Sequence, residues 1–334
     1  MVKCLIVSSD FGYREILGKS LIDIVIEKNK EISDFFVLVN KSLFPKYKEK
    51  IISKVVYVFD DDKDDLARYL NNDDTLIVLY DDYFIEEEIS VDDIVFEDKR
   101  YGYISCDGVK LNSLLDFQKL RQKLIVKRNA ELIDKGVDIV DVYNTFIDYD
   151  SDVKEGTVIH PNTVISSSII GKNCDISGRI IDSVVKDFVV IDNSVVEDAI
   201  VEDDVNVGPV SYIHDECILK KDCKVGSYVE LKKSVIGNGS KIKHQSVLLD
   251  CCVGDEVNVG AGVITANYDG EMKHITKIGN KAFVGCNSVL VAPVSIGEKS
   301  FIAADTTVVK NVGDNEFSIS RIDQIVKVRK KMNI

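Results

Sequence analysis

The sequence predicts a protein of two parts, an α/β domain with a parallel sheet followed by a parallel β-helix of six-residue repeats. Three observations lead to this prediction. The first 80 or so residues alternate apolar strand-like runs with polar helical segments, and a long helical pattern follows them. From about Val153 onward, aliphatic residues recur at steps of six, a period that fits neither a helix nor a half-buried strand. Such a period is typical of the parallel β-helix.

Four short apolar runs in the front part are typical of buried strands. They are CLIV (residues 4–7), FFVLV (35–39), VVYVF (55–59) and TLIVLY (75–80). Polar segments with helical character separate them, and strands that alternate with helices form a parallel sheet with helices on its faces. The front part is therefore expected to be a Rossmann-like α/β domain.

A long helix is expected to connect the two parts, within residues 111–135. Four apolar residues recur there at helical spacing: Leu114, Phe117, Leu120 and Leu124. Gly136 follows the pattern, and glycine commonly ends a helix because it adopts the left-handed conformation without strain.

The six-residue repeat is clearest near the end of the chain. Its aliphatic positions there are Ile278, Val284, Leu290, Ile296, Ile302 and Val308. The same step occurs in an earlier run (Val158, Val164, Ile170, Ile176) and in two pairs (Val225 with Leu231, Val253 with Val259). Each hexapeptide would form one side of a triangular coil with its aliphatic residue inward, so that stacked coils bury a continuous column. A β-sandwich is the alternative, but it predicts a period of two.

These patterns divide the chain into four expected regions. Residues 1–110 form the α/β domain, and residues 111–150 form the connecting helix and the segment that leaves it. Residues 151–320 form the β-helix, and residues 321–334 form a basic C-terminal tail.

Composition excludes several classes of function. The formal net charge of −14 argues against nucleic acid or an anionic membrane as the main partner. No stretch approaches the roughly 20 apolar residues that a membrane span needs, and the opening MVKCLIVSSDFG lacks the pattern of a signal peptide. The eight cysteines are scattered without metal-type spacing, which predicts reduced thiols and a cytoplasmic protein.

Positive charge is nevertheless concentrated in one segment of this acidic chain. Between Lys220 and Lys243 there are seven lysines and only two acids, Asp222 and Glu230. The segment is either a solvated lysine face or a phosphate site, since lysine ammonium groups bind phosphate as point charges. His244 follows directly, and it is either a structural histidine or a general base, a role for which imidazole is suited near neutral pH.

A loop interrupts the repeat just after this segment. NYDG (residues 267–270) is a turn signal, and the aliphatic register does not resume until Ile278. Long loops on rigid scaffolds often carry function, although many are only surface insertions.

The solenoid half also resembles a known family. The matching residues are GSKIKHQS, then VGDEVNVGAGVITANYDGEMKHITKIGNKAFVGCNSVLVAPVSIGEKSFIAADTTVVKNV, then ISR, within a match from about Gly208 to Arg321. They resemble the bifunctional N-acetylglucosamine-1-phosphate uridyltransferase / glucosamine-1-phosphate acetyltransferase family, which makes UDP-N-acetylglucosamine for peptidoglycan and cell wall biogenesis. The resemblance implies a left-handed parallel β-helix, a homotrimer and active sites between subunits.

The resemblance also assigns roles to residues of this sequence. The family's catalytic histidine falls on His244, and its phosphate-binding lysine falls on Lys232. Asn258 and His214 fall on other positions that contact the sugar substrate. The positions implied to bind acetyl-CoA are Ala261, Asn267, Tyr268, Lys273, Cys286, Ala304 and Arg321.

Three of the matched positions depart from the family pattern. His214 stands where the family has an arginine, which removes a guanidinium fork suited to phosphate. Val247 stands where the family has a tyrosine, and Cys286 replaces the usual serine. The coenzyme side therefore keeps the pattern better than the sugar-phosphate side.

The front half resembles the family's uridyltransferase domain in a shortened, degenerate form. SSDFGYRE (residues 8–15) stands where the family has a glycine-rich phosphate loop, and Asp10 places a carboxylate where phosphates would lie. Asp82 and Asn112 match the family's metal-binding residues, but much of the family's sequence between them is absent. We therefore expect uridyltransferase activity to be lost or weak, and Mg²⁺ to be needed only if this domain still works.

Three functions remain open from the sequence. The first is a cytoplasmic, homotrimeric glucosamine-1-phosphate N-acetyltransferase that uses acetyl-CoA as co-substrate. The second is an acetyltransferase for another amino sugar, which His214 and Val247 favour. The third is a non-catalytic trimeric scaffold related to the family.

Overall fold

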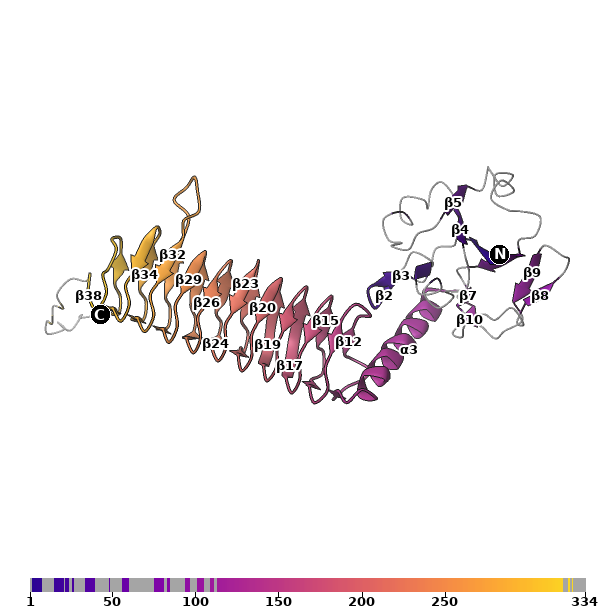
Figure 1. The fold of residues 1–334 in the computed structure, drawn as a ribbon, viewed down its shortest axis with the longest axis horizontal. Coiled ribbons are helices and arrows are strands. Elements are labelled where there is room, and N and C mark those ends of the chain that lie inside the picture. The colour runs from indigo at the N-terminus through magenta and orange to yellow at the C-terminus, as the bar shows by residue number, and fades with distance from the viewer. Residues whose placement is uncertain are drawn as a thin grey trace, which may run out of the picture. The chain divides into compact units, whose positions relative to one another are not determined.

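The computed structural model describes residues 113–320 continuously. Outside that range it describes residues 2–7, 15–20, 22–23, 26, 34–39, 48, 56–59, 75–80, 83–84, 94–96, 101–104, 109–110, 324 and 326. The chain divides into two compact units, residues 1–129 with 147–149, and residues 130–146 with 150–334 (Figure 1).

The described strands of the first unit are β1 (Val2–Val7), β2 (Glu15–Ile16), β3 (Lys19–Ser20), β4 (Asp34–Val39), β5 (Val56–Phe59), β6 (Thr75–Tyr80), β7 (Tyr83–Phe84), β8 (Ile94–Phe96), β9 (Tyr101–Ile104) and β10 (Val109–Lys110). Six of them form one sheet in the order β5-β4-β1-β6-β9-β8. Every neighbouring pair in this sheet is parallel except β8 with β9. The parallel sheet predicted from the four apolar runs is therefore confirmed.

The connecting helix is α3 (Leu114–Ile133). Ser113 caps its start, because its hydroxyl oxygen accepts the backbone N–H of Asp116 at 3.2 Å and its O–H donates to the Asp116 carboxylate at 2.8 Å. Gly136 ends it in the left-handed conformation, with φ of 89°. Three of the four predicted apolar positions are buried, namely Phe117, Leu120 and Leu124. The fourth, Leu114, is 54% exposed, because it lies at the first turn.

The second unit is a parallel β-solenoid whose short strands stack in three ladders (Figure 1). The first face consists of β11 (Asp138–Ile139), β14 (Val158–Ile159), β21 (Asn206–Val207), β24 (Lys224–Ser227), β27 (Lys241–His244), β30 (Asn258–Val259), β33 (Phe283–Val284), β36 (Phe301–Ile302) and β38 (Phe317–Ser318). The second face consists of β12 (Phe146–Ile147), β15 (Val164–Ser166), β22 (Tyr212–His214), β25 (Glu230–Lys232), β28 (Val247–Leu249), β31 (Ile264–Ala266), β34 (Val289–Val291) and β37 (Thr307–Val308).

Two strands, β17 (Asp175–Ile181) and β19 (Val190–Glu197), run across both of these faces. The third face consists of β13 (Asp152–Val153), β16 (Ile169–Ile170), β18 (Val184–Val185), β20 (Ala199–Val201), β23 (Cys217–Leu219), β26 (Val235–Ile236), β29 (Cys251–Val253), β32 (Thr276–Ile278) and β35 (Val294–Ile296). We call the turn between the first and second faces the first corner, and the turn between the second and third faces the second corner.

The core of the solenoid is the predicted column of aliphatic side chains. All six residues of the clearest register, from Ile278 to Val308, are at most 3% exposed. Burying each such side chain stabilises the fold by about 1.5–3 kcal/mol. The prediction for the earlier run is wrong at two positions. Ile159 and Ile165 point inward and are fully buried, whereas Val158 and Val164 do not. The step from Ile165 to the next inward residue is five rather than six, and this shorter step displaces the register.

Candidate active site

A vertical column of residues at the first corner brings the predicted base together with three predicted coenzyme positions. The column contains Ser227, His244, Ala261, Cys286 and Ala304, one from each successive coil. Backbone hydrogen bonds link successive members of the column. The carbonyl oxygen of each member accepts an N–H group from the coil that follows, and the donor residue comes directly after the next member in the sequence. The four N···O distances are 2.9, 3.4, 2.8 and 2.7 Å. Because parallel strands are about 4.8 Å apart, the histidine and the coenzyme positions form one continuous edge.

His244 stands at the end of β27 with its side chain exposed. Small residues, Ser227 and Ala261, lie before and after it in the column. The buried Ser246 hydroxyl holds the corner in place, since it bonds the carbonyl oxygens of His244 and Gly260 at 2.9 and 3.0 Å. No residue of the described range hydrogen-bonds the His244 ring, so both ring nitrogens are available to a substrate. The imidazole is therefore placed to accept a proton at an open corner.

The lysine predicted to bind phosphate lies on the second face, one coil before His244. Lys232 ends β25 and pairs in register with His214 on one side and Leu249 on the other. Five positions of chain lead from His244 to Leu249, and they turn the first corner at Gln245, where φ is 47°. Val247 faces outward midway. A histidine and a long lysine side chain can converge over Val247 from the two ends of this face.

His214 is less accessible than the resemblance implied. It is 7% exposed, and its ring stacks on Tyr212 with centroids 4.0 Å apart. Its Nδ1 lies 3.0 Å from the Asp215 carboxylate. Its Nε2 is buried, lies 3.5 Å from the Glu230 carboxylate and has no well-oriented hydrogen-bond partner. As it stands, His214 supports the wall of the site and does not present a free ring.

Asn258 lies on the first face, three residues before Ala261. It faces outward and is exposed, and it pairs in register with Lys241 and Phe283. It therefore flanks the corner column on the side opposite Lys232.

The predicted coenzyme loop leaves the solenoid at the second corner, between β31 and β32, and projects from the coil (Figure 1). Asn267 is buried at its base, where its side-chain amide donates to the Asp250 carboxylate. Tyr268 is 60% exposed and pairs with Lys273 across the hairpin. Within one chain, these three loop residues lie at a different corner from the column of His244.

Asp269 organises this loop, a role that the sequence reasoning missed. Its carboxylate accepts the backbone N–H groups of Glu271 and Met272, both at 2.8 Å, and lies 2.6 Å from Nε2 of His274. The hydrogen bond from Met272 is the main cause that lowers the pKa of this carboxyl, followed by that from His274. The NYDG turn signal points to an aspartate in this role, because aspartate side chains bond backbone groups two residues ahead.

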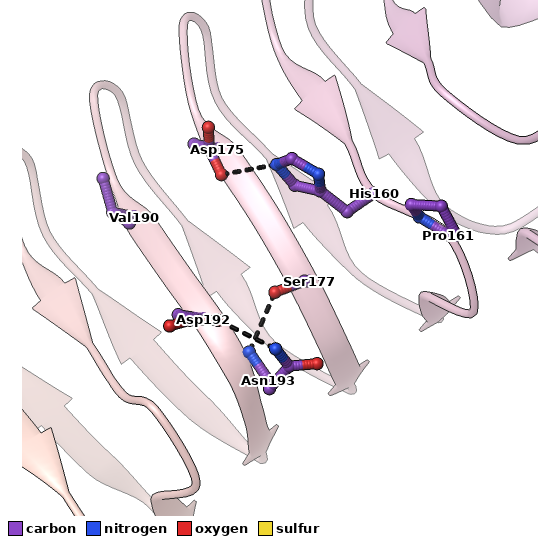
Figure 2. A pocket seen from close by; sticks show the side chains of 7 residues that line it. All are labelled: His160, Pro161, Asp175, Ser177, Val190, Asp192 and Asn193. Atoms are coloured by element: carbon purple, nitrogen blue, oxygen red, sulfur yellow. Dashed lines mark hydrogen bonds and ion pairs between the residues drawn. The ribbon is translucent and has the colours of Figure 1, made fainter.

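A separate hollow lies on earlier coils and contains none of the predicted site residues (Figure 2). It has a volume of about 490 Å³ and is lined by His160, Pro161, Asp175, Ser177, Val190, Asp192 and Asn193. It forms because the first corner is shortened here: inward positions are four residues apart at Ile176 and Ile180, against six at Ile159 and Ile165. In Figure 2 the His160 ring points to Asp175, at 2.9 Å. The hollow is a consequence of coil length, and the corner column is the better candidate site.

Three predicted site residues, Asp82, Asn112 and Arg321, lie outside the described residues. Within the described residues, no group of three or more histidine, cysteine, aspartate or glutamate side chains is arranged to hold a metal ion. Of the helices described, none is both long and apolar enough to cross a membrane.

The fold and the corner column define the chain as a hexapeptide-repeat β-solenoid protein with an exposed histidine beside three of the predicted coenzyme positions. No family model matches the chain. The bifunctional protein GlmU of Carboxydothermus hydrogenoformans is 33% identical over 329 residues, which cover 96% of this chain and 70% of that protein. GlmU of Thermotoga sp. (strain RQ2) is 39% identical over 249 residues, 74% of this chain and 56% of that protein. The chain therefore belongs to the family of the bifunctional protein GlmU, as the resemblance predicted.

The chain spans only part of these relatives, between 56% and 70% of their lengths in the two matches. Among solved structures, a variant of perosamine N-acetyltransferase from Caulobacter crescentus, in complex with CoA and GDP-perosamine, matches 95% of this chain and 93% of its own. The identity is 14% and the TM-score is 0.24. This distant likeness carries no argument about function.

Proposed function

We propose that the protein is an N-acetyltransferase that moves the acetyl group of acetyl-CoA to the amine of glucosamine 1-phosphate. The observation that carries this proposal is the corner column, in which His244 directly precedes Ala261, Cys286 and Ala304. A thioester bound along this edge would end beside an imidazole that no residue of the described part of the chain hydrogen-bonds. Lys232 lies at the far end of the second face, where it can hold the acceptor's phosphate.

The chemistry follows from this arrangement. An ammonium group cannot attack a thioester, so His244 takes a proton from the acceptor's amine. The nitrogen then bonds to the thioester carbon and the C–S bond breaks. The CoA thiolate leaves and takes a proton from the His244 imidazolium, and the second proton of the original ammonium passes to solvent. Lys232 binds the phosphate and thereby orients the amine, which lowers the entropic cost of reaching the transition state. Backbone N–H groups at the corner are suited to stabilise the developing oxyanion.

The site is proposed to be completed between copies of the chain. The loop that carries Asn267, Tyr268 and Lys273 leaves the solenoid at the second corner, whereas the other described coenzyme positions lie at the first. In a homotrimer packed side by side, the loop of one copy can cover the first corner of the next. The same proposal places the protein in the cytoplasm, where acetyl-CoA is available.

A second candidate acceptor is another amino sugar. Two observations favour it. The His214 side chain is buried and does not present a free ring, and Val247 offers no hydroxyl where the family has tyrosine. The test measures CoA release from acetyl-CoA with the full chain, alone and with glucosamine 1-phosphate, glucosamine or other amino sugars. If glucosamine 1-phosphate is the one acceptor that gives CoA release, the first proposal is supported. If release occurs with another acceptor and not with glucosamine 1-phosphate, the second is supported. No release with any acceptor would leave the scaffold function.

Acetyl-CoA is expected to protect Cys286 from alkylation but not Cys252. Within residues 113–320 these are the two exposed cysteines. Burial raises the pKa of the other thiols in this range, to about 11 for Cys217 and about 12 for Cys223, which keeps them unreactive. Labelling with iodoacetamide, followed by peptide mass spectrometry, gives the rate at each site.

The prediction is a slowing of labelling at Cys286 by about tenfold in saturating acetyl-CoA, with Cys252 as the internal control, since bound ligand removes access to the thiolate. Cys252 lies on the third face, away from the column. Equal slowing at both cysteines, or no slowing at Cys286, would place the coenzyme elsewhere.

We expect uridyltransferase activity to be lost or weak. Asp10 introduces a negative charge into the segment that matches the phosphate loop, and it would repel the triphosphate of UTP. Asp10, Asp82 and Asn112 lie outside the described residues, so the expectation rests on the sequence. Pyrophosphate release from UTP and N-acetylglucosamine 1-phosphate with Mg²⁺ checks it, and protein-dependent release as fast as acetyl transfer would refute it.

A further inference from the structure

The strongest feature that the proposed function leaves unused is a pair of carboxylates, those of Asp215 and Glu230, in the charge cluster around Lys232. Its Nζ lies 3.0 Å from Oδ2 of Asp215, and the other carboxylate oxygen of Asp215 lies 3.0 Å from Nδ1 of His214. Glu230 approaches the opposite nitrogen of His214, at 3.5 Å. Lys232 is thus already paired with an anion that belongs to the chain itself.

The cluster is ordered by the backbone. Asp215 follows directly after β22 and adopts the left-handed conformation, with φ of 52°. Because His214 and Lys232 pair in register on neighbouring strands, one carboxylate at this corner reaches both of them. The backbone N–H of Lys233 also donates to the carbonyl oxygen of Asp215, at 3.0 Å, and ties the turn to the next coil.

Asp215 stays ionised at every working pH. The hydrogen bond from Lys232, and then that from His214, lowers the pKa of the Asp215 carboxyl to about 2. A carboxyl whose pKa is depressed on folding keeps its charge above the unfolded-state value of about 3.9, and loses the stabilising contact only as the pH falls toward the folded value. The Asp215 carboxylate in turn raises the pKa of Lys232. The pair is therefore fully charged from pH 5 to pH 9.

We propose that Asp215 is a specificity-determining residue, which occupies Lys232 with an internal carboxylate and so weakens the binding of phosphorylated acceptors. This inference rests on the proposed function, in which Lys232 binds the acceptor's phosphate. A phosphate must displace Asp215 from Lys232 and must also approach the Asp215 and Glu230 carboxylates. An amino sugar without a phosphate meets neither obstacle.

The test is Asp215→Asn in the full chain. Asparagine tolerates the left-handed conformation, so the turn is kept while the charge is removed. The KM for glucosamine 1-phosphate is expected to fall roughly three- to tenfold, the size expected when an exposed competing ion pair is lost. We expect kcat to stay within about twofold and the KM for unphosphorylated glucosamine to be unchanged.

Asp204→Asn is the matched control. Asp204 also adopts the left-handed conformation, with φ of 61°, and also pairs with a lysine, Lys221, at 3.4 Å. It should leave both KM values unchanged. A KM for glucosamine 1-phosphate that is unchanged or higher in Asp215→Asn would overturn the inference, and so would an equal fall for glucosamine.

Direct binding separates this inference from the proposed function. Calorimetric titration of the native chain and both variants with inorganic phosphate needs no turnover. The inference is supported if Asp215→Asn binds phosphate more tightly than the native chain and Asp204→Asn does not. If the same preparations transfer no acetyl group to glucosamine 1-phosphate, the proposed function fails and the inference stands. Equal binding by all three proteins contradicts the inference.

Discussion

His244→Ala is expected to lower kcat for acetyl transfer by about 10²–10⁴-fold, because it removes the general base that takes the proton of the amine. The side chain is exposed at the end of β27, so its removal leaves no cavity in the core. Acetyl-CoA binding should persist, since the backbone and the small residues of the column are unchanged. Acceptor-dependent CoA release, together with protection of Cys286 by acetyl-CoA, measures both effects in one preparation.

His160→Ala is the matched control for this prediction. His160 is half-buried on the solenoid surface, and its side chain pairs with Asp175 at 2.9 Å, away from the corner column. Its replacement should leave kcat within about twofold of the native value. Retention of more than a tenth of native kcat in His244→Ala would contradict the role of His244 as base, as would an equal loss in His160→Ala.

Gly226→Ala is expected to destabilise the solenoid by about 2–3 kcal/mol, the upper range for forced overpacking. A methyl group at Gly226 would lie 1.9 Å from the carbonyl oxygen of Lys243, on the neighbouring coil. That oxygen belongs to the backbone, so β27 itself must move, and β27 carries His244. We therefore expect a lower thermal midpoint by circular dichroism and a lower kcat in the surviving folded protein.

Gly239→Ala separates this close contact from the general effect of losing a glycine. A methyl group at Gly239 meets only a side-chain carbon of Glu256, at 3.9 Å, although φ there is 64°. Its cost is the left-handed conformation alone, about 1–2 kcal/mol. If Gly226→Ala proved as stable as Gly239→Ala, the close approach of Gly226 to the backbone of Lys243 would be contradicted.

Most of the solenoid could be predicted from the sequence because a single physical rule generates it. Each coil must place an aliphatic residue inward on every face. The six-residue register from Ile278 to Val308 therefore predicts the fold without further information. The rule fails where a corner changes length. The five-residue step after Ile165 displaced the predicted register to Val158 and Val164, since nothing local distinguishes a short corner from a long one.

The candidate site was only partly predictable. Sequence order places Lys232, His244 and Ala261 near one another, but it does not say which corner each occupies. The strand register reveals that His244 shares a corner with Ala261, whereas the loop at Asn267 leaves from another. Asp215 shows the same limit, because its contact with Lys232 crosses between coils and appears in no motif.

Acetyl transfer to the sugar nitrogen is tested most sharply by following the acetyl group itself. The full chain is incubated with acetyl-CoA labelled with ¹³C in the acetyl group and with glucosamine 1-phosphate, and the sugar product is examined by NMR and mass spectrometry. The native chain is expected to form a product with one labelled acetyl group, bound as an amide to the sugar nitrogen, and His244→Ala is expected to lose it. Label found as an ester on a sugar oxygen, or only as free acetate, would contradict this expectation.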